Sequence, residues 1–238
     1  MAVTPLLGAL LVAAAAAGAS ALAALPFMRL GTVQERSLGL ASALAGGLML
    51  GLAYVLLIAA MHAPTTTLAA SAVLGILFVV ATDRVSGQSA GNDARAGYRQ
   101  LLGSALHAAH EGVAIGAALA ADFRFGMFTA AAIAVHNVPE SATLVAGLRA
   151  RGARLGEAAG LAVSANANQV LFAVAALALA TAWPALRPWI TGFAVGALVQ
   201  LVLVELLPGS YRTSGRASIA FVTIAAMGAV TLLRTLVP

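Results

Sequence analysis

The sequence contains no cysteine and no lysine, and it has few charged residues of any kind. Charged residues make up 9% of the 238 residues, whereas about a quarter of the residues are charged in an ordinary soluble domain. So few charges cannot cover the surface of a soluble fold, which excludes a cytosolic globular enzyme. The lack of cysteine excludes a disulfide-held secreted domain and a thiolate metal site. The hydrophobic share of 61% excludes a disordered chain and indicates a membrane protein.

The basic residues do not indicate binding to nucleic acid. All 13 of them are arginines, and they are scattered between long apolar runs. A protein that follows a phosphate backbone needs a basic stripe or patch, and the sequence has none. We therefore expect no nucleic-acid partner.

Long apolar runs predict an all-α, multi-pass membrane protein. About 20 apolar residues cross a hydrocarbon core of about 30 Å, and charges, prolines and glycines divide the chain into eight such runs. The runs cover residues 5–28, 38–60, 66–82, 100–121, 125–148, 156–181, 188–208 and 217–236. The longest connection, residues 83–99, has the composition of a loop. We expect one transmembrane domain over residues 1–238, with the first run as a span because it lacks the basic start of a signal peptide.

The distribution of arginine predicts the orientation. Connections on one side of the eight spans hold ten arginines, and those on the other side hold three. The ten are Arg29, Arg36, Arg84, Arg95, Arg99, Arg149, Arg151, Arg154, Arg212 and Arg216. Because cytoplasmic connections are enriched in positive residues, we expect both termini outside the cytoplasm. The predicted location is the cytoplasmic (inner) membrane.

Apart from Glu157 and Arg234 near span ends, six histidine and glutamate side chains fall inside the predicted spans. An ionisable group in hydrocarbon costs at least a few kcal/mol, so each one marks a candidate functional site. They are His107, His110, Glu111, His136, Glu140 and Glu205.

Two of these spans carry the same pair of ligand types. His107 precedes Glu111 by four residues in span four, and His136 precedes Glu140 by four residues in span five. Residues at i and i+4 share one helix face, and antiparallel neighbouring helices would bring both pairs to a similar depth. Imidazole and carboxylate ligands suit a divalent transition metal. The sequence therefore predicts an intramembrane metal site, with a purely structural polar network as the alternative.

Three residues outside the two His/Glu pairs bear on an ion path. Pro139 leaves the carbonyl of Val135 without its helical hydrogen bond, and a freed carbonyl is tolerated where it faces protein or a water-filled cavity. His110 is either a ligand or a gate residue beside the ligands. Glu205 is either a transfer site near the cytoplasmic exit, which we favour, or a carboxylate at a span end that reaches water.

The two motifs resemble the signatures of the ZIP (Zrt/Irt-like) family of divalent-metal transporters. The span-four signature of that family has the form HNxPEG, and the sequence has HAAHEG at residues 107–112 and the similar HNVPES at residues 136–141. Span two (ALAGGLMLGLAYVLL) and span seven (GFAVGALVQLVLVELLPGSY) also look like family segments. Eight spans with both termini outside match the family layout. His110 in place of proline and Ser141 in place of glycine indicate an atypical, bacterial-type member.

The resemblance implies a set of metal ligands. Carried over residue by residue, the set is His107, Glu111 and Glu140, with His136 as a further candidate. The second metal of some members would use an asparagine in span four and an acid in span six, where this sequence has Ala108 and only amides. We therefore predict one bound metal. Additional candidates for ligands or pathway residues are His110, Asn137, Glu205, Gln169, Asn168 and Met49, although core packing explains Met49 equally well.

These observations predict a transporter and not an enzyme. We expect Zn²⁺, or else Mn²⁺, Fe²⁺, Cd²⁺ or Co²⁺, to move into the cytoplasm by alternating access. The expected partners are the lipid bilayer and the metal ion. The sequence does not decide between a monomer and a homodimer. A membrane metal sensor that does not transport, or a bundle that binds haem, is the alternative. An intramembrane zinc hydrolase is less favoured because HxxHE is neither HExxH nor HxxEH.

Overall fold

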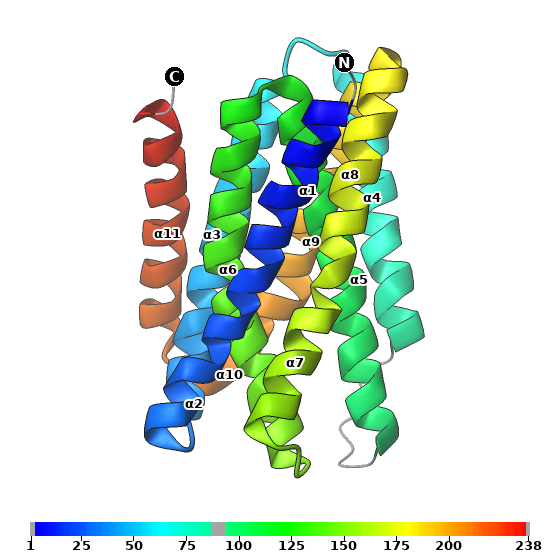
Figure 1. Cartoon of the computed structure of the whole chain (residues 1–238). Coiled ribbons are helices and arrows are strands. Elements are labelled where there is room, and N and C mark those ends of the chain that lie inside the picture. The colour runs from blue at the N-terminus through cyan, green and yellow to red at the C-terminus, as the bar shows by residue number, and fades with distance from the viewer. Residues whose placement is uncertain (1–2, 87–93, 237–238) are drawn as a thin grey trace.

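The described residues of the chain fold as a bundle of eight helical rods (Figure 1). The computed structural model describes residues 3–86 and 94–236, and every regular element in these ranges is a helix. Five rods are single helices: α3 (Glu35–Ala59), α4 (Thr65–Ser86), α5 (Ala94–Ala121), α6 (Phe123–Ala150) and α11 (Arg216–Leu236). One rod consists of α1 (Val3–Gly18), η1 (Ala19–Ala24) and α2 (Leu25–Leu30). Another consists of α7 (Leu155–Ala165) and α8 (Ala167–Ala182). The eighth comprises η2 (Pro184–Leu186), α9 (Arg187–Leu201), η3 (Val202–Leu206) and α10 (Leu207–Thr213).

The eight rods overlap the eight predicted runs in order, but the loop predicted over residues 83–99 is wrong at both ends. Helix α4 continues to Ser86 and α5 already begins at Ala94; the rest of that loop, residues 87–93, lies outside the described residues. Polar residues end an apolar run without ending a helix. The early turns of α5 are held by tertiary contacts, since Arg151 Nη1 donates a hydrogen bond to Gln100 Oε1 at 2.9 Å.

Six of the eight rods are long and apolar enough to cross a membrane. Among the described residues, α5 and α6 are the long helices that do not meet this criterion. They carry the histidines and glutamates of the two motifs, and these polar side chains lower their hydropathy. Eight membrane crossings therefore stay a prediction.

The start of α1 and the end of α11 lie at the same end of the bundle (Figure 1). The connections of α2 with α3, of α6 with α7 and of α10 with α11 lie at the opposite end. This opposite end is the one that the sequence assigns to the arginine-rich side, and we call it the arginine end. Which end faces the cytoplasm stays a prediction.

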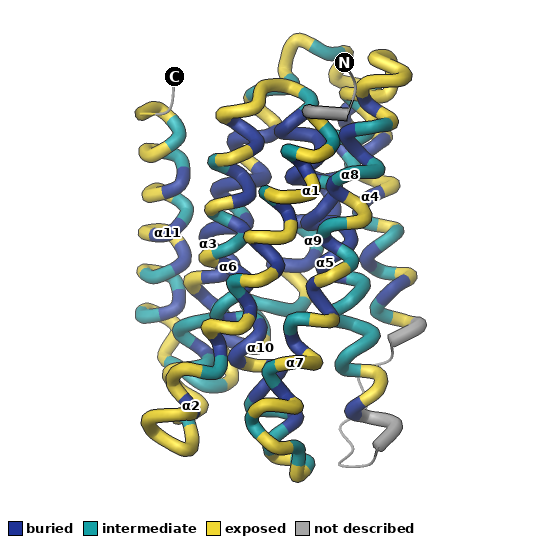
Figure 2. The backbone as a smooth tube through the Cα atoms, viewed as in Figure 1, coloured by how far each residue is buried: buried dark blue, intermediate teal, exposed yellow. Residues whose placement is uncertain are grey.

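Small residues let the helices that carry the motifs approach closely. A Cβ atom added to Gly112 of α5 would collide with the backbone carbonyl of Gln169 on α8 and would lie 3.0 Å from the nitrogen of Ala173. Residues toward the interior of the bundle are buried, whereas those on the outward sides of α1, α4 and α11 are largely exposed (Figure 2). Those outward faces are apolar, as expected where helices meet lipid.

Candidate metal centre

Helix α5 points three polar side chains into the bundle. His107, His110 and Glu111 stand at i, i+3 and i+4, which places them on one face of the helix. All three residues are buried. On α6, His136 is also buried, and the helix continues through Pro139 without a break.

Glu111, His136 and Glu140 form the first ligand group, which we call the buried cluster. His136 Nε2 lies 3.1 Å from Glu111 Oε1 and 3.0 Å from Glu140 Oε2. The other ring nitrogen, Nδ1, lies 3.2 Å from the backbone carbonyl oxygen of Ala45 on α3. Because a carbonyl oxygen only accepts, Nδ1 carries the proton and donates, which orients the ring with Nε2 toward the carboxylates.

This arrangement brings acceptor atoms together in a dry interior. With Nδ1 protonated, the hydrogen bond between His136 Nε2 and Glu140 Oε2 at 3.0 Å requires one further proton, on the ring or on the carboxyl group, and this proton has to leave before a metal binds. Neither carboxylate oxygen of Glu111 makes a hydrogen bond of acceptable geometry. Buried charges are normally paired or coordinate a metal. A metal cation at this position would bind Nε2 and both carboxylates together. A proton on Nε2 would compensate the carboxylates only in part.

Asp83, His107 and Glu205 form the second ligand group, which we call the end cluster. His107 Nε2 lies 3.1 Å from Glu205 Oε2 and 3.9 Å from Asp83 Oδ1. Glu205 stands in η3, a π-helical turn. The turn precedes Pro208, which has no N–H to bond to the carbonyl of Val204. Such turns occur frequently at functional sites.

Glu140 links the two clusters. Its Oε2 lies 3.0 Å from His136 Nε2, and its Oε1 lies 3.9 Å from His107 Nδ1. The four ligands expected from the sequence are therefore close together, but they are divided between two groups. His107 belongs to the end cluster, and Glu111, His136 and Glu140 belong to the buried cluster.

Exposure of the ligands rises toward the arginine end. The side chains of Glu111 and His136 are fully buried, whereas those of Glu140, Asp83 and Glu205 are 18%, 28% and 32% exposed. Water therefore reaches the end cluster more easily than the buried cluster.

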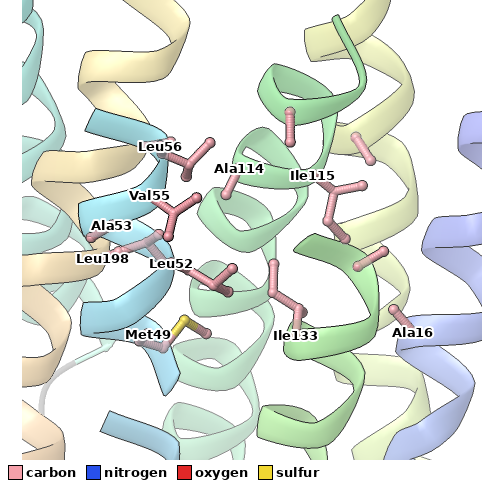
Figure 3. Close-up of a cluster of buried hydrophobic side chains, with 14 of the residues drawn as sticks. Ala16, Met49, Leu52, Ala53, Val55, Leu56, Ala114, Ile115, Ile133 and Leu198 are labelled. Atoms are coloured by element: carbon pink, nitrogen blue, oxygen red, sulfur yellow. The ribbon is translucent and has the colours of Figure 1, made fainter. Parts of the chain in front are cut away.

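An apolar layer closes the other side of the buried cluster. Ala114 and Ile115 follow Glu111 by about one turn of α5, and Ile133 precedes His136 by about one turn of α6. These side chains pack in one core cluster with Leu52 and Leu198 (Figure 3). Beyond that layer lies a cavity of about 300 Å³, whose lining includes Leu56, His62, Ala117, Phe125 and Arg187. An apolar layer thus lies between the two clusters and this cavity, and the more exposed carboxylates lie toward the arginine end.

The amide candidates are bound to other parts of the fold. Asn137 Nδ2 donates to the carbonyl of Ala16 and to Gln169 Oε1, both at 2.9 Å. Asn168 Nδ2 donates to the carbonyl of Ala105 at 3.1 Å. These bonds tie α1, α5, α6 and α8 together, whereas Asn137 Oδ1 is buried and makes no hydrogen bond.

Met49 lies in the interior of the apolar core (Figure 3). It is fully buried and is not among the residues that line the cavity at the far end. Core packing accounts for its position.

Sequence reasoning missed Asp83. The predicted span ended at residue 82, and Asp83 was assigned to a loop. The helix continues to Ser86, so the carboxylate stays on α4 and reaches His107. The available signal was the antiparallel pairing of neighbouring spans, which places the end of α4 beside the early turns of α5.

Two comparisons with known proteins bear on this site. The family model described as "ZIP Zinc transporter" matches residues 83–233, which include both clusters. A curated protein of Arabidopsis thaliana, named "Putative zinc transporter", is 33% identical over 133 residues. The match covers 54% of this chain but 22% of that relative, so the chain spans only about a fifth of the relative's length.

Proposed function

Because the chain belongs to the ZIP zinc transporter family, we propose that it transports a divalent transition metal, with Zn²⁺ as the preferred ion. The observation that carries this proposal is the convergence of His136 Nε2 on carboxylate oxygens of Glu111 and Glu140 at 3.1 Å and 3.0 Å. Imidazole and carboxylate are ligands that Zn²⁺ accepts, and the ring is already oriented by its bond to Ala45.

The proposed path runs from the buried cluster to the arginine end. An ion held by Glu111, His136 and Glu140 passes to His107, Asp83 and Glu205, with Glu140 in contact with both groups. The increasing exposure of these carboxylates supports release at the arginine end. Together with the orientation predicted from arginine, this gives transport toward the cytoplasm through the cytoplasmic membrane.

Transport also requires that the buried cluster opens to the opposite side. In this conformation an apolar layer around Leu52 and Ile115 separates the cluster from the far cavity. We propose alternating access, in which α5 and α6 move relative to α3 and α9 and this layer parts. One ion is bound at a time, because a second site would need an asparagine in span four and an acid in span six, where the chain has Ala108 and only amides.

Uptake into proteoliposomes loaded with a metal-sensitive dye tests the proposal. We expect saturable Zn²⁺ uptake by the wild type and none by Glu111→Ala or Glu140→Ala. Glu157→Gln is the control, since Glu157 lies at the exposed start of α7, away from both clusters. Uptake by the two alanine variants at the wild-type rate would refute the assignment of the site. Metal binding by the wild type without flux would favour a sensor instead.

A further inference from the structure

His110 is a buried imidazole without a hydrogen-bond partner. The residue is 1% exposed, and neither Nδ1 nor Nε2 makes a hydrogen bond of acceptable geometry. The carbonyl of Leu106, four residues earlier on α5, accepts no hydrogen bond from the ring. A buried imidazole normally has a partner for its N–H, so this ring lacks the contacts expected of a purely structural histidine.

The ring lies between the two clusters. His110 and His107 are three residues apart on the same face of α5, and their ring centroids are 5.8 Å apart in an edge-on arrangement. His110 directly precedes Glu111 of the buried cluster in the chain, and Glu140 Oε1, which belongs to the same cluster, lies 3.9 Å from His107 Nδ1. The groups around the unpartnered ring are therefore members of both clusters.

The separation of the two rings fits shared coordination of one ion. With Zn–N distances of about 2.0–2.1 Å and a tetrahedral angle, the centroids of two imidazoles on one Zn²⁺ lie about 5 Å apart. The observed 5.8 Å is slightly wider. Among the described residues, His110 is not part of either compact ligand group, so its ring has to turn or α5 and α6 have to shift before it binds.

We propose that His107, His110 and Glu140 form an intermediate metal site, through which the ion passes between the buried cluster and the end cluster. This inference rests on the proposed function. As the ion leaves His136, Glu140 keeps hold of it, and the imidazoles of His107 and His110 replace the ligands that it loses. No bond within the protein is made or broken, and only coordination changes.

The intermediate site also gives the path a chemical preference. Two imidazoles beside one carboxylate favour Zn²⁺ over Mn²⁺, because carboxylate and other oxygen ligands suit Mn²⁺ better than imidazole does. His110 is therefore a residue that determines selectivity. Ions that bind imidazole poorly pass this point slowly, even when the buried cluster accepts them.

The first test compares Zn²⁺ and Mn²⁺ uptake by the wild type, His110→Phe and His110→Gln in proteoliposomes. Phenylalanine keeps a ring in contact with His107 but offers no ligand, and glutamine keeps a polar group. We expect the ratio of Zn²⁺ to Mn²⁺ uptake to fall about tenfold in His110→Phe, the size of effect seen when a residue that supports a metal site is lost. Thr129→Val is the matched control, because it removes another buried polar atom without a hydrogen bond, in α6. Its ratio should equal that of the wild type.

The second test does not depend on transport or on the folding of a variant. The chain has four histidines, so a wild-type sample with ¹⁵N-labelled histidine in lipid nanodiscs gives four assignable pairs of imidazole signals. We expect titration with Zn²⁺ to shift the signals of His107, His110 and His136 and to leave those of His62 unchanged. A response of His107 and His136 without His110 would overturn this inference but not the proposed function. No response of any histidine and no uptake would overturn both.

Discussion

His136 Nε2 on α6 lies 3.1 Å from Glu111 Oε1 on α5, and both side chains are fully buried. This contact joins the two helices that carry the paired motifs, at the innermost point of the ligand path. Because the Nδ1 atom of the same ring is oriented by the Ala45 carbonyl, the imidazole cannot turn away without losing a hydrogen bond. The geometry keeps Nε2 directed at the two carboxylates, so that the three groups face one position that a proton or a metal ion can occupy.

Glu111→Gln should separate stability from metal binding. A buried carboxylate without a hydrogen bond destabilises the empty protein, because its desolvation is not compensated. We therefore expect the metal-free variant to melt at the wild-type temperature or above it. Saturating Zn²⁺ should raise the melting temperature of the wild type, since a ligand at about 100 times its Kd contributes about 2.7 kcal/mol. The variant should show no such rise. A full Zn²⁺-dependent rise in Glu111→Gln, measured by thermal melts in detergent, would contradict this prediction.

Gly112→Val should destabilise the packing of α5 against α8. The added side chain would collide with the Gln169 carbonyl, and overpacking of this kind costs about 1–3 kcal/mol. The measurement is the free energy of unfolding in mixed micelles. Gly160→Ala in α7 is the control, because a Cβ atom there meets nothing within 4 Å. We expect that control to be neutral or slightly stabilising. Equal stabilities of Gly112→Val and the wild type would show that the two helices can separate freely.

Hydrophobic runs predicted the order of the helices because each run of about 20 apolar residues corresponds to one rod. They did not predict where helices end beyond the apolar region. A helix that continues through polar residues keeps Asp83 on α4 and brings it to His107. Helix periodicity placed His107 and Glu111 on one face but could not assign them to different clusters. That division depends on where α3, α4 and the π-helical turn of Glu205 lie relative to α5, and none of these tertiary positions is encoded in local spacing.

Glu205→Gln should slow transport more than it weakens binding. Glu205 contacts His107 at the exposed end of the path. Glu111 and His136 belong to the buried cluster, and their contact is unchanged in the variant. We expect kcat for Zn²⁺ uptake to fall about tenfold, with a smaller change in KM. Glu35→Gln, in the exposed first turn of α3, is the control. A large rise in KM with unchanged kcat would instead make Glu205 a residue of initial binding, which contradicts its position as an exit ligand.

Single cysteines should report the orientation and the seal of the path, since the natural sequence has none. Residue 62 lies between α3 and α4, at the end of the bundle where α1 starts and α11 ends. Residue 154 lies between α6 and α7, at the arginine end. In intact cells, a maleimide that cannot cross membranes should label His62→Cys, whereas Arg154→Cys should react only after permeabilisation. Ala114→Cys, fully buried in the apolar layer, should react much more slowly than His62→Cys, because a reagent reaches it only when the layer parts. Labelling of Arg154→Cys in intact cells would reverse the predicted orientation, and with it the proposed direction of release.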